Sequence, residues 1–487
     1  MSVDIRVPGG VVRGRDEGGI AVFRGIPFAS LPVRFGEPEA VRPWRGARDA
    51  FAFGPPPPQP SAFGMDDGAD SGTDSVTDWL TVNVWSPGLS GRRPVMVWIQ
   101  GGGYAFGMSG LPEYDGAALA GDGVVVVTFN YLVGLEGFGF LPGSPPNRGL
   151  LDQVAALRWV RANIAAFGGD PDRVTVFGQS AGAGSIAALL VMPRARGLFR
   201  RAIVQSMPGA YFSPALATDI AEVCAGQLSL TPGQLASVDP RALPAAGDAV
   251  AARLPEYADR WGLAAHAGVL FAPVVDGDVL PVTPWQGLTG DVDLVVGHTR
   301  HEQRLLSALT GRLGQVTDGE AAEAAELFGP DPGRYRRAFP DPEELYDVVR
   351  SDWQFRMPSI GLADAQLAAG GTAYVYELTW PAPGMGGRLG ACHGLDVPLV
   401  FGNLGAGQPA VLIGSDTRGA REVSRQMRGA WTAFATTGDP GWESFTAGAT
   451  RLFDVPGSVA PYPERISREI WRDPPAVLGL GRVATAG

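Results

Sequence analysis

The residues most able to do chemistry lie in the segment VTVFGQSAGAGS, where Gly178 and Gly182 flank Ser180. The pattern G-x-S-x-G is typical of a serine nucleophile at a sharp turn between a strand and a helix, because bulky flanking residues would clash there. The amino end of the following helix favours a developing negative charge. The pattern also arises by chance in a chain with 69 glycines, so its surroundings must support it.

The same segment contains a second pattern, G-x-G-x-x-A at Gly182, Gly184 and Ala187, which is similar to a dinucleotide-binding turn. Its first glycine lies five positions beyond the end of the predicted strand, which is too far for a tight crossing. An acid that binds the ribose is expected about 20 residues later. However, no Asp or Glu occurs between Asp172 and Asp219, so we favour the nucleophile over the cofactor turn.

A serine nucleophile needs a base, and the chain offers four histidines, which are His266, His298, His301 and His393. Hydrolases with this turn carry serine, acid and histidine in that order, so the last histidine leaves the most room for an acid. His393 also follows a glycine-rich segment, where a mobile catalytic base often lies. We predict His393 as the base, His298 and His301 as polar residues near a strand end, and His266 as structural.

Glu302 is the favoured acid because it follows the predicted strand LVVG, at the carboxyl edge where active sites of α/β proteins gather. Asp276 in PVVDGDVLP remains the alternative, although Asp-Gly after an apolar run is usually a turn. A glycine triplet follows Gln100 and the predicted strand VMVWI. Its backbone N–H groups could bind a carbonyl oxygen with no side chain in the way, so we predict an oxyanion hole there.

Strands that alternate with helices would position these residues. Apolar runs rich in valine and aromatic residues predict buried strands at 95–99, 124–129, 174–177, 202–204, 294–296, 373–378 and 452–455. Helical patterns cover 150–167 and 420–438, and long loops are expected at 54–75 and 381–390. The alternation predicts an α/β fold with a mainly parallel sheet. Short antiparallel strands at 3–7, 11–13 and 20–24 would form its edge, and a single domain is expected over 1–487.

Composition excludes several classes of function. The net charge of −11 and the pI near 5.0 disfavour nucleic acid or an anionic membrane as partner. All 39 basic residues are arginine, so neither a Walker A phosphate loop nor Schiff-base chemistry is available. No metal-binding pattern occurs, and neither a metal nor a cofactor is expected.

The same composition bears on location. Two cysteines, no signal-peptide pattern at the start and no apolar run of the roughly 20 residues that a bilayer span needs favour a cytoplasmic protein. The sequence leaves the oligomeric state open.

Taken together, these segments resemble the type-B carboxylesterases, a family of the α/β-hydrolase superfamily that includes cholinesterases and bacterial para-nitrobenzyl esterases. The resemblance covers most of the chain. It rests on ten motifs in order, which are FRGIPFASLPVRF, TVNVWSP, VWIQGGGY, FNYLVGLEGFGF, RGLLDQVAALRWVRANIAAFGGDPDRVTVFGQSAGAGS, RRAIVQS, FAPVVDGDVLP, VVGHTRHE, CHGLDVPLVFGN and GAWTAFATTGDP.

The resemblance implies a serine esterase that forms an acyl-enzyme. Ser180 would attack the acyl carbonyl, His393 would carry the proton, and Glu302 would orient the imidazole. The N–H groups of Gly102, Gly103 and Ala181 would hold the oxyanion. A small-molecule ester would be the substrate and water the acceptor. The alternative keeps the triad for biosynthetic acyl transfer, cyclisation, or cleavage of a carbamate or amide.

Two positions depart from the family pattern and bear on the substrate pocket. Gln100 stands where many members have histidine, and Met207 stands where a glycine is usual. We expect Tyr104, Phe106 and Met207 to bind substrate, and Tyr211 and Phe212 to lie near them, which would favour an apolar acyl or alcohol group. The sequence does not identify the ester itself.

Overall fold

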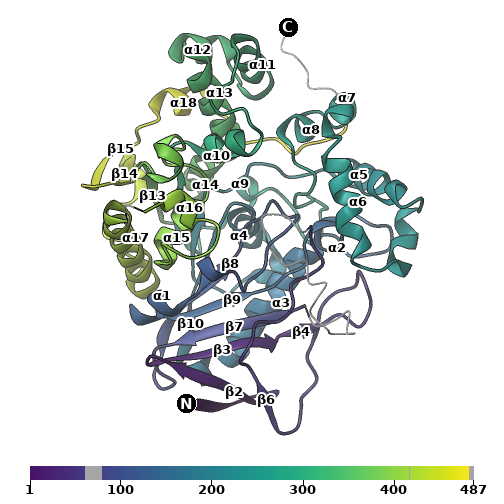
Figure 1. The fold of residues 1–487 in the computed structure, drawn as a ribbon, viewed down its shortest axis with the longest axis vertical. Helices are drawn as coiled ribbons and strands as arrows, with labels where there is room; N and C mark the ends of the chain where they lie inside the picture. Colours follow the sequence, from purple (N-terminus) through teal and green to yellow (C-terminus); the bar gives the residue numbers. More distant parts are fainter. Residues whose placement is uncertain (61–78, 416, 482–487) are drawn as a thin grey trace.

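A mixed β-sheet runs through the chain, and the computed structural model describes it over residues 1–60, 79–415 and 417–481 (Figure 1). The strands are β1 (Ser2–Val7), β2 (Gly10–Glu17), β3 (Ile20–Pro27), β4 (Ala29–Ser30), β5 (Glu39–Ala40), β6 (Ala47–Asp49), β7 (Thr81–Ser86), β8 (Arg93–Ile99), β9 (Val125–Phe129), β10 (Gly169–Gln179), β11 (Arg201–Gln205), β12 (Asp293–Thr299), β13 (Ala373–Leu378), β14 (Ala449–Phe453) and β15 (Ser458–Pro461).

The central strands of this sheet are parallel. The order is β1-β2-β3-β7-β9-β8-β10-β11-β12-β13-β14-β15, and β6 pairs with β2, while β4 and β5 pair separately. All pairs from β9 to β14 along this order are parallel. The pairs from β1 to β9 and the last pair are antiparallel. The predicted α/β class, with its antiparallel amino-terminal edge, is confirmed, whereas the strands β4, β5, β6, β7 and β15 were not predicted.

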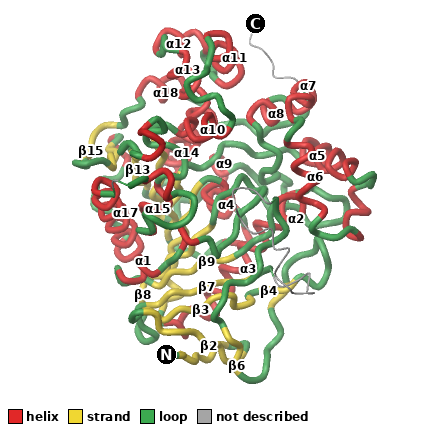
Figure 2. Tube along the Cα trace, viewed as in Figure 1, coloured by secondary structure: helices red, strands yellow, loops and turns green. Residues whose placement is uncertain are grey.

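Helices cover the sheet (Figure 2). They are α1 (Ala117–Gly121), α2 (Gly134–Phe138), α3 (Arg148–Asn163), α4 (Ala181–Val191), α5 (Pro214–Gln227), α6 (Ala242–Ala251), α7 (Ala258–Trp261), α8 (Leu263–Ala267), α9 (Pro284–Gly287), α10 (Glu302–Leu309), α11 (Asp318–Phe328), α12 (Pro332–Ala338), α13 (Pro342–Ser351), α14 (Met357–Ala368), α15 (Asp396–Phe401), α16 (Ala410–Ile413), α17 (Arg418–Thr437) and α18 (Arg465–Ile470).

The alternation of side chains along the strands produces two cores, one on each face. In β8, Val95, Val97 and Ile99 pack with residues of α3 and α4, whereas Met96 and Trp98 pack with residues of α15 and α17. Successive strand residues point to opposite faces, so a strand buried on both faces must be apolar throughout. This explains why the buried runs were recognisable in the sequence.

Both predicted helices are present. The helix expected at 150–167 is α3, which ends at Asn163 and continues as a 3-10 turn to Gly168, whose φ is 80°. The helix expected at 420–438 is α17, and it ends at Gly438 with a φ of 87°. In both cases a glycine in the left-handed region ends the helical segment, as is common at C-caps.

The two predicted loops fare differently. Residues 61–75 of the loop expected at 54–75 lie outside the described residues. The loop expected at 381–390 contains a short 3-10 turn, Gly384–Gly387, and is otherwise irregular. Across the described ranges, no helix combines the length and apolar character needed to cross a bilayer.

Candidate active site

Ser180 lies at the tip of the turn between β10 and α4, with a φ of 55° and a ψ of −126°. A non-glycine residue in this region of backbone space is strained and persists only where its surroundings fix it. Here the Ser180 N–H donates to the carbonyl of Gln205 at the end of β11, at 2.9 Å. The predicted strand–turn–helix context of the serine is therefore present.

Close packing against β8 explains the glycines around the serine. A Cβ on Gly178 would lie 2.7 Å from the Ile99 carbonyl oxygen, and one on Gly182 would lie 1.9 Å from the same atom. A Cβ on Gly184 would lie 2.3 Å from the hydroxyl of Tyr104. Backbone and side-chain contacts thus account for each glycine, including the two that matched a dinucleotide-binding turn.

Glu302 and His393 form a buried hydrogen-bonded pair. The Glu302 Oε2 atom lies 2.5 Å from His393 Nδ1. The other carboxylate oxygen accepts bonds from the Ser206 hydroxyl at 2.6 Å and from the Thr299 N–H at 2.8 Å. Burial opposes ionisation of Glu302, but the charge of His393 and these hydrogen bonds together hold the pKa of the carboxyl below its usual value.

Asp276 and His298 make hydrogen bonds typical of structural residues. The Asp276 carboxylate accepts N–H bonds from Asp278, Val279 and Leu280, which makes it the turn residue that its sequence favoured. His298 lies within β12 and contacts the hydroxyl of Tyr462 at 2.9 Å. Burial lowers the pKa of His298 to about 4.

His301 holds the segment that carries His393. Its N–H donates to the carbonyl of Ala391 at 2.9 Å, and its Nδ1 atom accepts the N–H of Ala391 at 3.2 Å. Burial lowers the pKa of His301 to about 3, so the ring stays neutral and Nδ1 remains an acceptor. His301 thus helps to position the segment that carries the predicted base, His393, through its bonds to Ala391.

A second support comes from a π-helical turn, Asp352–Arg356, between α13 and α14. It places the Phe355 ring against the imidazole of His393, with centroids 4.2 Å apart and planes inclined by 28°. Single π-helical turns inside α-helices are often found at functional sites. Neither Phe355 nor Ser206 was predicted to belong to the site.

The second ring nitrogen of His393, Nε2, is hydrogen-bonded to the residue that precedes Ser180. The Gln179 amide nitrogen lies 3.0 Å from His393 Nε2. Because Nδ1–H donates to the ionised Glu302, Nε2 is the acceptor and the Gln179 amide donates to it. In a serine–histidine–acid triad this nitrogen accepts the serine hydroxyl, so here the Gln179 amide occupies that acceptor.

The glycine triplet lies beside the serine. Gly102 has a φ of 117°, and a Cβ there would lie 2.0 Å from the carbonyl oxygen of Phe106. Gly102, Gly103 and Ala181 all line the same cavity as Ser180. Ala181 is the first residue of α4, so its N–H is one of the donors that a helix leaves without an internal partner. These are the three residues expected to supply the oxyanion hole.

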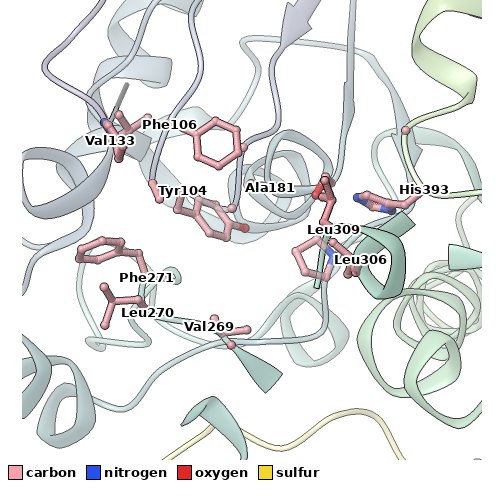
Figure 3. A pocket seen from close by; sticks show the side chains of 18 of the residues that line it. Tyr104, Phe106, Val133, Ala181, Val269, Leu270, Phe271, Leu306, Leu309 and His393 are labelled. Atoms are coloured by element: carbon pink, nitrogen blue, oxygen red, sulfur yellow. The ribbon is translucent and has the colours of Figure 1, made fainter. Parts of the chain in front are cut away.

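The cavity measures about 800 Å³, and Ser180 and His393 both line it. Figure 3 shows Tyr104, Phe106 and apolar side chains such as Phe271 and Leu306 around it. Tyr104 and Phe106 line this cavity, and their binding of substrate stays a prediction, whereas Met207 is fully buried and does not line it. Gln100 is buried too, and it also lies outside the lining.

Met207 thus stands as a correction, whereas Tyr211 and Phe212 were expected only to lie near the pocket. Both aromatic side chains are 1% exposed and neither lines the cavity. The Tyr211 hydroxyl donates to the carbonyl of Gly184, so its polar end is used within the protein. Among the described residues, no group of three or more His, Cys, Asp or Glu side chains could hold a metal ion.

Comparisons with known proteins show which family the chain is similar to. The sequence profile of the carboxylesterase family matches residues 2–324 and 340–454. The para-nitrobenzyl esterase of Bacillus subtilis is 36% identical over 451 residues, which cover 89% of this chain and 90% of that protein. The phenmedipham hydrolase of Pseudarthrobacter oxydans is 35% identical over 459 residues, covering 90% and 91% respectively.

The fold is shared with solved structures as well. The crystal structure of a Geobacillus stearothermophilus carboxylesterase superposes with a TM-score of 0.83 at 34% sequence identity. The match covers 96% of this chain and all of the other. The arrangement of sheet and helices is therefore the α/β-hydrolase fold that the motifs implied.

Proposed function

This chain belongs to the carboxylesterase family and is a carboxylesterase, and from that premise we propose that it acts through an acyl-enzyme on Ser180. His393 is the proposed base and Glu302 its acid partner. One observation carries the proposal, namely that His393, bonded to the buried Glu302, lines the same cavity as the strained Ser180. A strained nucleophile beside an oriented imidazole is the arrangement that serine hydrolases use.

In the proposed reaction, the Ser180 oxygen attacks the acyl carbonyl and its proton passes to His393 Nε2. Glu302 stabilises the imidazolium, and the N–H groups of Gly102, Gly103 and Ala181 bind the oxyanion. The alcohol then leaves with the proton from His393. Water enters, gives its proton to the imidazole and attacks the acyl-enzyme, which releases the acid and restores the Ser180 hydroxyl.

The proposal requires Gln179 to release the imidazole. Nε2 has one lone pair in the plane of the ring, so the Gln179 amide and the Ser180 hydroxyl compete for it. The Gln179 amide would rotate away when an ester enters the cavity, which Gln179 also lines.

The decisive experiment is a burst assay with p-nitrophenyl butyrate on the wild type and on Ser180→Ala. We expect a burst of nitrophenol in the wild type and a loss of kcat on the order of 10⁴–10⁶ in the variant, by comparison with other triads. Ser237→Ala changes an exposed serine and serves as the matched control. Steady hydrolysis by folded Ser180→Ala protein would contradict the acyl-enzyme.

The same assay identifies the acceptor of the acyl group. Added alcohols or amines that divert the acyl group from water would favour acyl transfer over hydrolysis.

We also propose a cytoplasmic location, supported by the two free, buried cysteines, Cys224 and Cys392. Fractionation of the source cells tests that location, and recovery in an extracellular fraction would contradict it.

A further inference from the structure

The carboxyl-terminal segment, residues 464–478, reaches the proposed base through buried side chains. His393 packs on the ring of Phe355, which belongs to the π-helical turn Asp352–Arg356. Within the segment, α18 shares an apolar cluster with α13, the helix that leads into this turn (Figure 1). Because a π-helical turn departs from the usual α-helical bonding, the contacts around it bear on where the Phe355 ring lies.

An arginine at the end of the turn is buried between two carboxylates. Arg356 is 1% exposed, with Nε 3.1 Å from Asp352 Oδ1 and Nη2 2.5 Å from Glu464 Oε2. Asp352 belongs to the same turn, whereas Glu464 immediately precedes α18. Burial disfavours the charged form of Arg356, but the two carboxylates together hold its pKa above the ordinary value. The charge on Glu464 thus has a buried partner in the turn, and its loss would leave Arg356 less compensated.

A chain of hydrogen bonds joins the same turn to the residue that follows α18. The Trp471 indole N–H donates to the Tyr335 hydroxyl at 2.6 Å, and that hydroxyl donates to Asp352 Oδ2 at 2.7 Å. Such bonds strengthen one another when they are buried in series. At the far end of the segment, the Leu478 N–H donates to the Tyr211 carbonyl at 2.8 Å. The segment is therefore fixed at both ends.

Glu464, Trp471 and Tyr335 all lie outside the residues that the family profile matches, so a role for them does not follow from membership of the family. We propose that Glu464 and Trp471 position the base, because they hold the π-helical turn and the turn holds Phe355 against His393. Neither Glu464 nor Trp471 lines the active-site cavity, so both act through Phe355 as positioning residues. The inference rests on the proposed function, in which His393 is the base.

Glu464→Gln removes the charge with little change of shape. We expect kcat for p-nitrophenyl butyrate to fall about three- to tenfold with KM nearly unchanged, because the base is displaced while the cavity wall is intact. Trp471→Phe removes one N–H donor and should lower kcat about two- to fivefold, which gives a second measurement should Glu464→Gln fail to fold. Glu469→Gln is the matched control, since it removes the same charge from an exposed position of α18, and it should leave kcat unchanged.

A double-mutant cycle with Phe355→Leu shows whether the effect passes through the ring. In the Phe355→Leu background, Glu464→Gln should change kcat by less than about 1.5-fold, because the contact that Glu464 positions is already absent. A general loss of stability would lower kcat by the same factor in both backgrounds. Equal factors in the two backgrounds would therefore overturn the proposal.

The position of the imidazole can also be measured without catalysis. Full-length Ser180→Ala protein with carbon-13 at the Cε1 atoms of its four histidines gives four NMR signals, and His393→Ala identifies the one that belongs to the base. Phe355→Leu removes the ring and defines the full ring-current shift of that signal. Glu464→Gln should move the signal part of the way in the same direction, whereas Glu469→Gln should leave it in place.

The outcomes separate this inference from the proposed function. A His393 signal that stays in place in Glu464→Gln would overturn the positioning role, and so would a shifted signal with an unchanged kcat. Steady hydrolysis by Ser180→Ala protein would count against the acyl-enzyme instead, and would leave the NMR result standing.

Discussion

The two sides of the active site are held in different ways. On the serine side, β10, β11 and α4 fix Ser180 through backbone contacts, with Gly178 and Gly182 pressed against the end of β8. On the histidine side, separate segments bring Glu302, His393 and Phe355 together through side-chain contacts. Substitutions on the serine side should therefore lower stability and activity together. Substitutions on the histidine side should lower activity while the protein stays folded.

The largest effect on the histidine side is expected from Glu302→Gln. Loss of the carboxylate leaves the imidazole in the wrong tautomer, and kcat should fall by about 10⁴-fold as in comparable triads. Steady-state hydrolysis of p-nitrophenyl butyrate checks this, with Asp276→Asn as the control that should stay active. Full activity of Glu302→Gln would return Asp276 to consideration.

The same variant has a consequence for stability against pH. Because the folded-state pKa of Glu302 is lowered, its ionised form stabilises the fold above the ordinary carboxyl pKa of 4.5. That contribution disappears as the pH falls through the lowered folded-state pKa. Urea unfolding at pH 7 and at pH 3 should therefore show a larger gap between wild type and variant at pH 7.

Gly182→Ala tests the serine side. Its new Cβ would overlap the Ile99 carbonyl, so β8 and α4 must separate. We expect a loss of about 1–3 kcal/mol in the free energy of unfolding and a fall of about 10²-fold in kcat. Gly226→Ala, in α5 with open space around it, should be neutral or slightly stabilising. Equal unfolding free energies for the two variants would contradict the backbone account.

Phe355→Leu should have a smaller effect on the histidine side. Ring stacking is worth about 0.5–1.5 kcal/mol, which corresponds to a loss of up to about tenfold in kcat with little change in KM. Phe167→Leu removes a buried ring that packs against Phe23 and Trp159, neither of which lines the active-site cavity, and should cost stability alone. A changed KM with an unchanged kcat would argue that Phe355 contacts substrate rather than positioning the base.

Gln179→Ala should give the smallest change, and in the opposite direction. Removal of the amide frees Nε2 for the Ser180 hydroxyl, so kcat should rise by about two- to fivefold, which is the worth of a modest hydrogen bond. Gln354→Ala alters the same cavity wall without touching that bond and should leave kcat unchanged. A fall in kcat would show that Gln179 holds the imidazole in place.

Much of the serine side could be predicted from the sequence because its information is local. The apolar strand, the glycines and the helix that follow each other around Ser180 all lie within one segment. Glu302 could also be predicted, since it lies a few residues beyond a predicted strand at the carboxyl edge of the sheet. Parallel strands place their carboxyl ends at one edge of the sheet, so Glu302 could be placed near Ser180 without knowing any side-chain contact.

The supports of the histidine side could not be found in the same way. Ser206 follows β11 at the same edge and could have been proposed by the rule that selected Glu302. Phe355 had no such signal, because its position depends on a π-helical turn that the sequence SDWQFRMP does not predict. Met207 was misplaced because its neighbour in the chain, Pro208, lines the cavity while the Met207 side chain points into the core.

The distance along the chain between the two sides affects when the enzyme becomes competent. Gln179 and His393, which touch in the folded protein, are 214 residues apart in sequence. During synthesis from the amino terminus, the serine turn can form long before its base leaves the ribosome. A nascent chain would thus carry the proposed nucleophile without its proposed base, and esterase activity would then report completion of the carboxyl-terminal third.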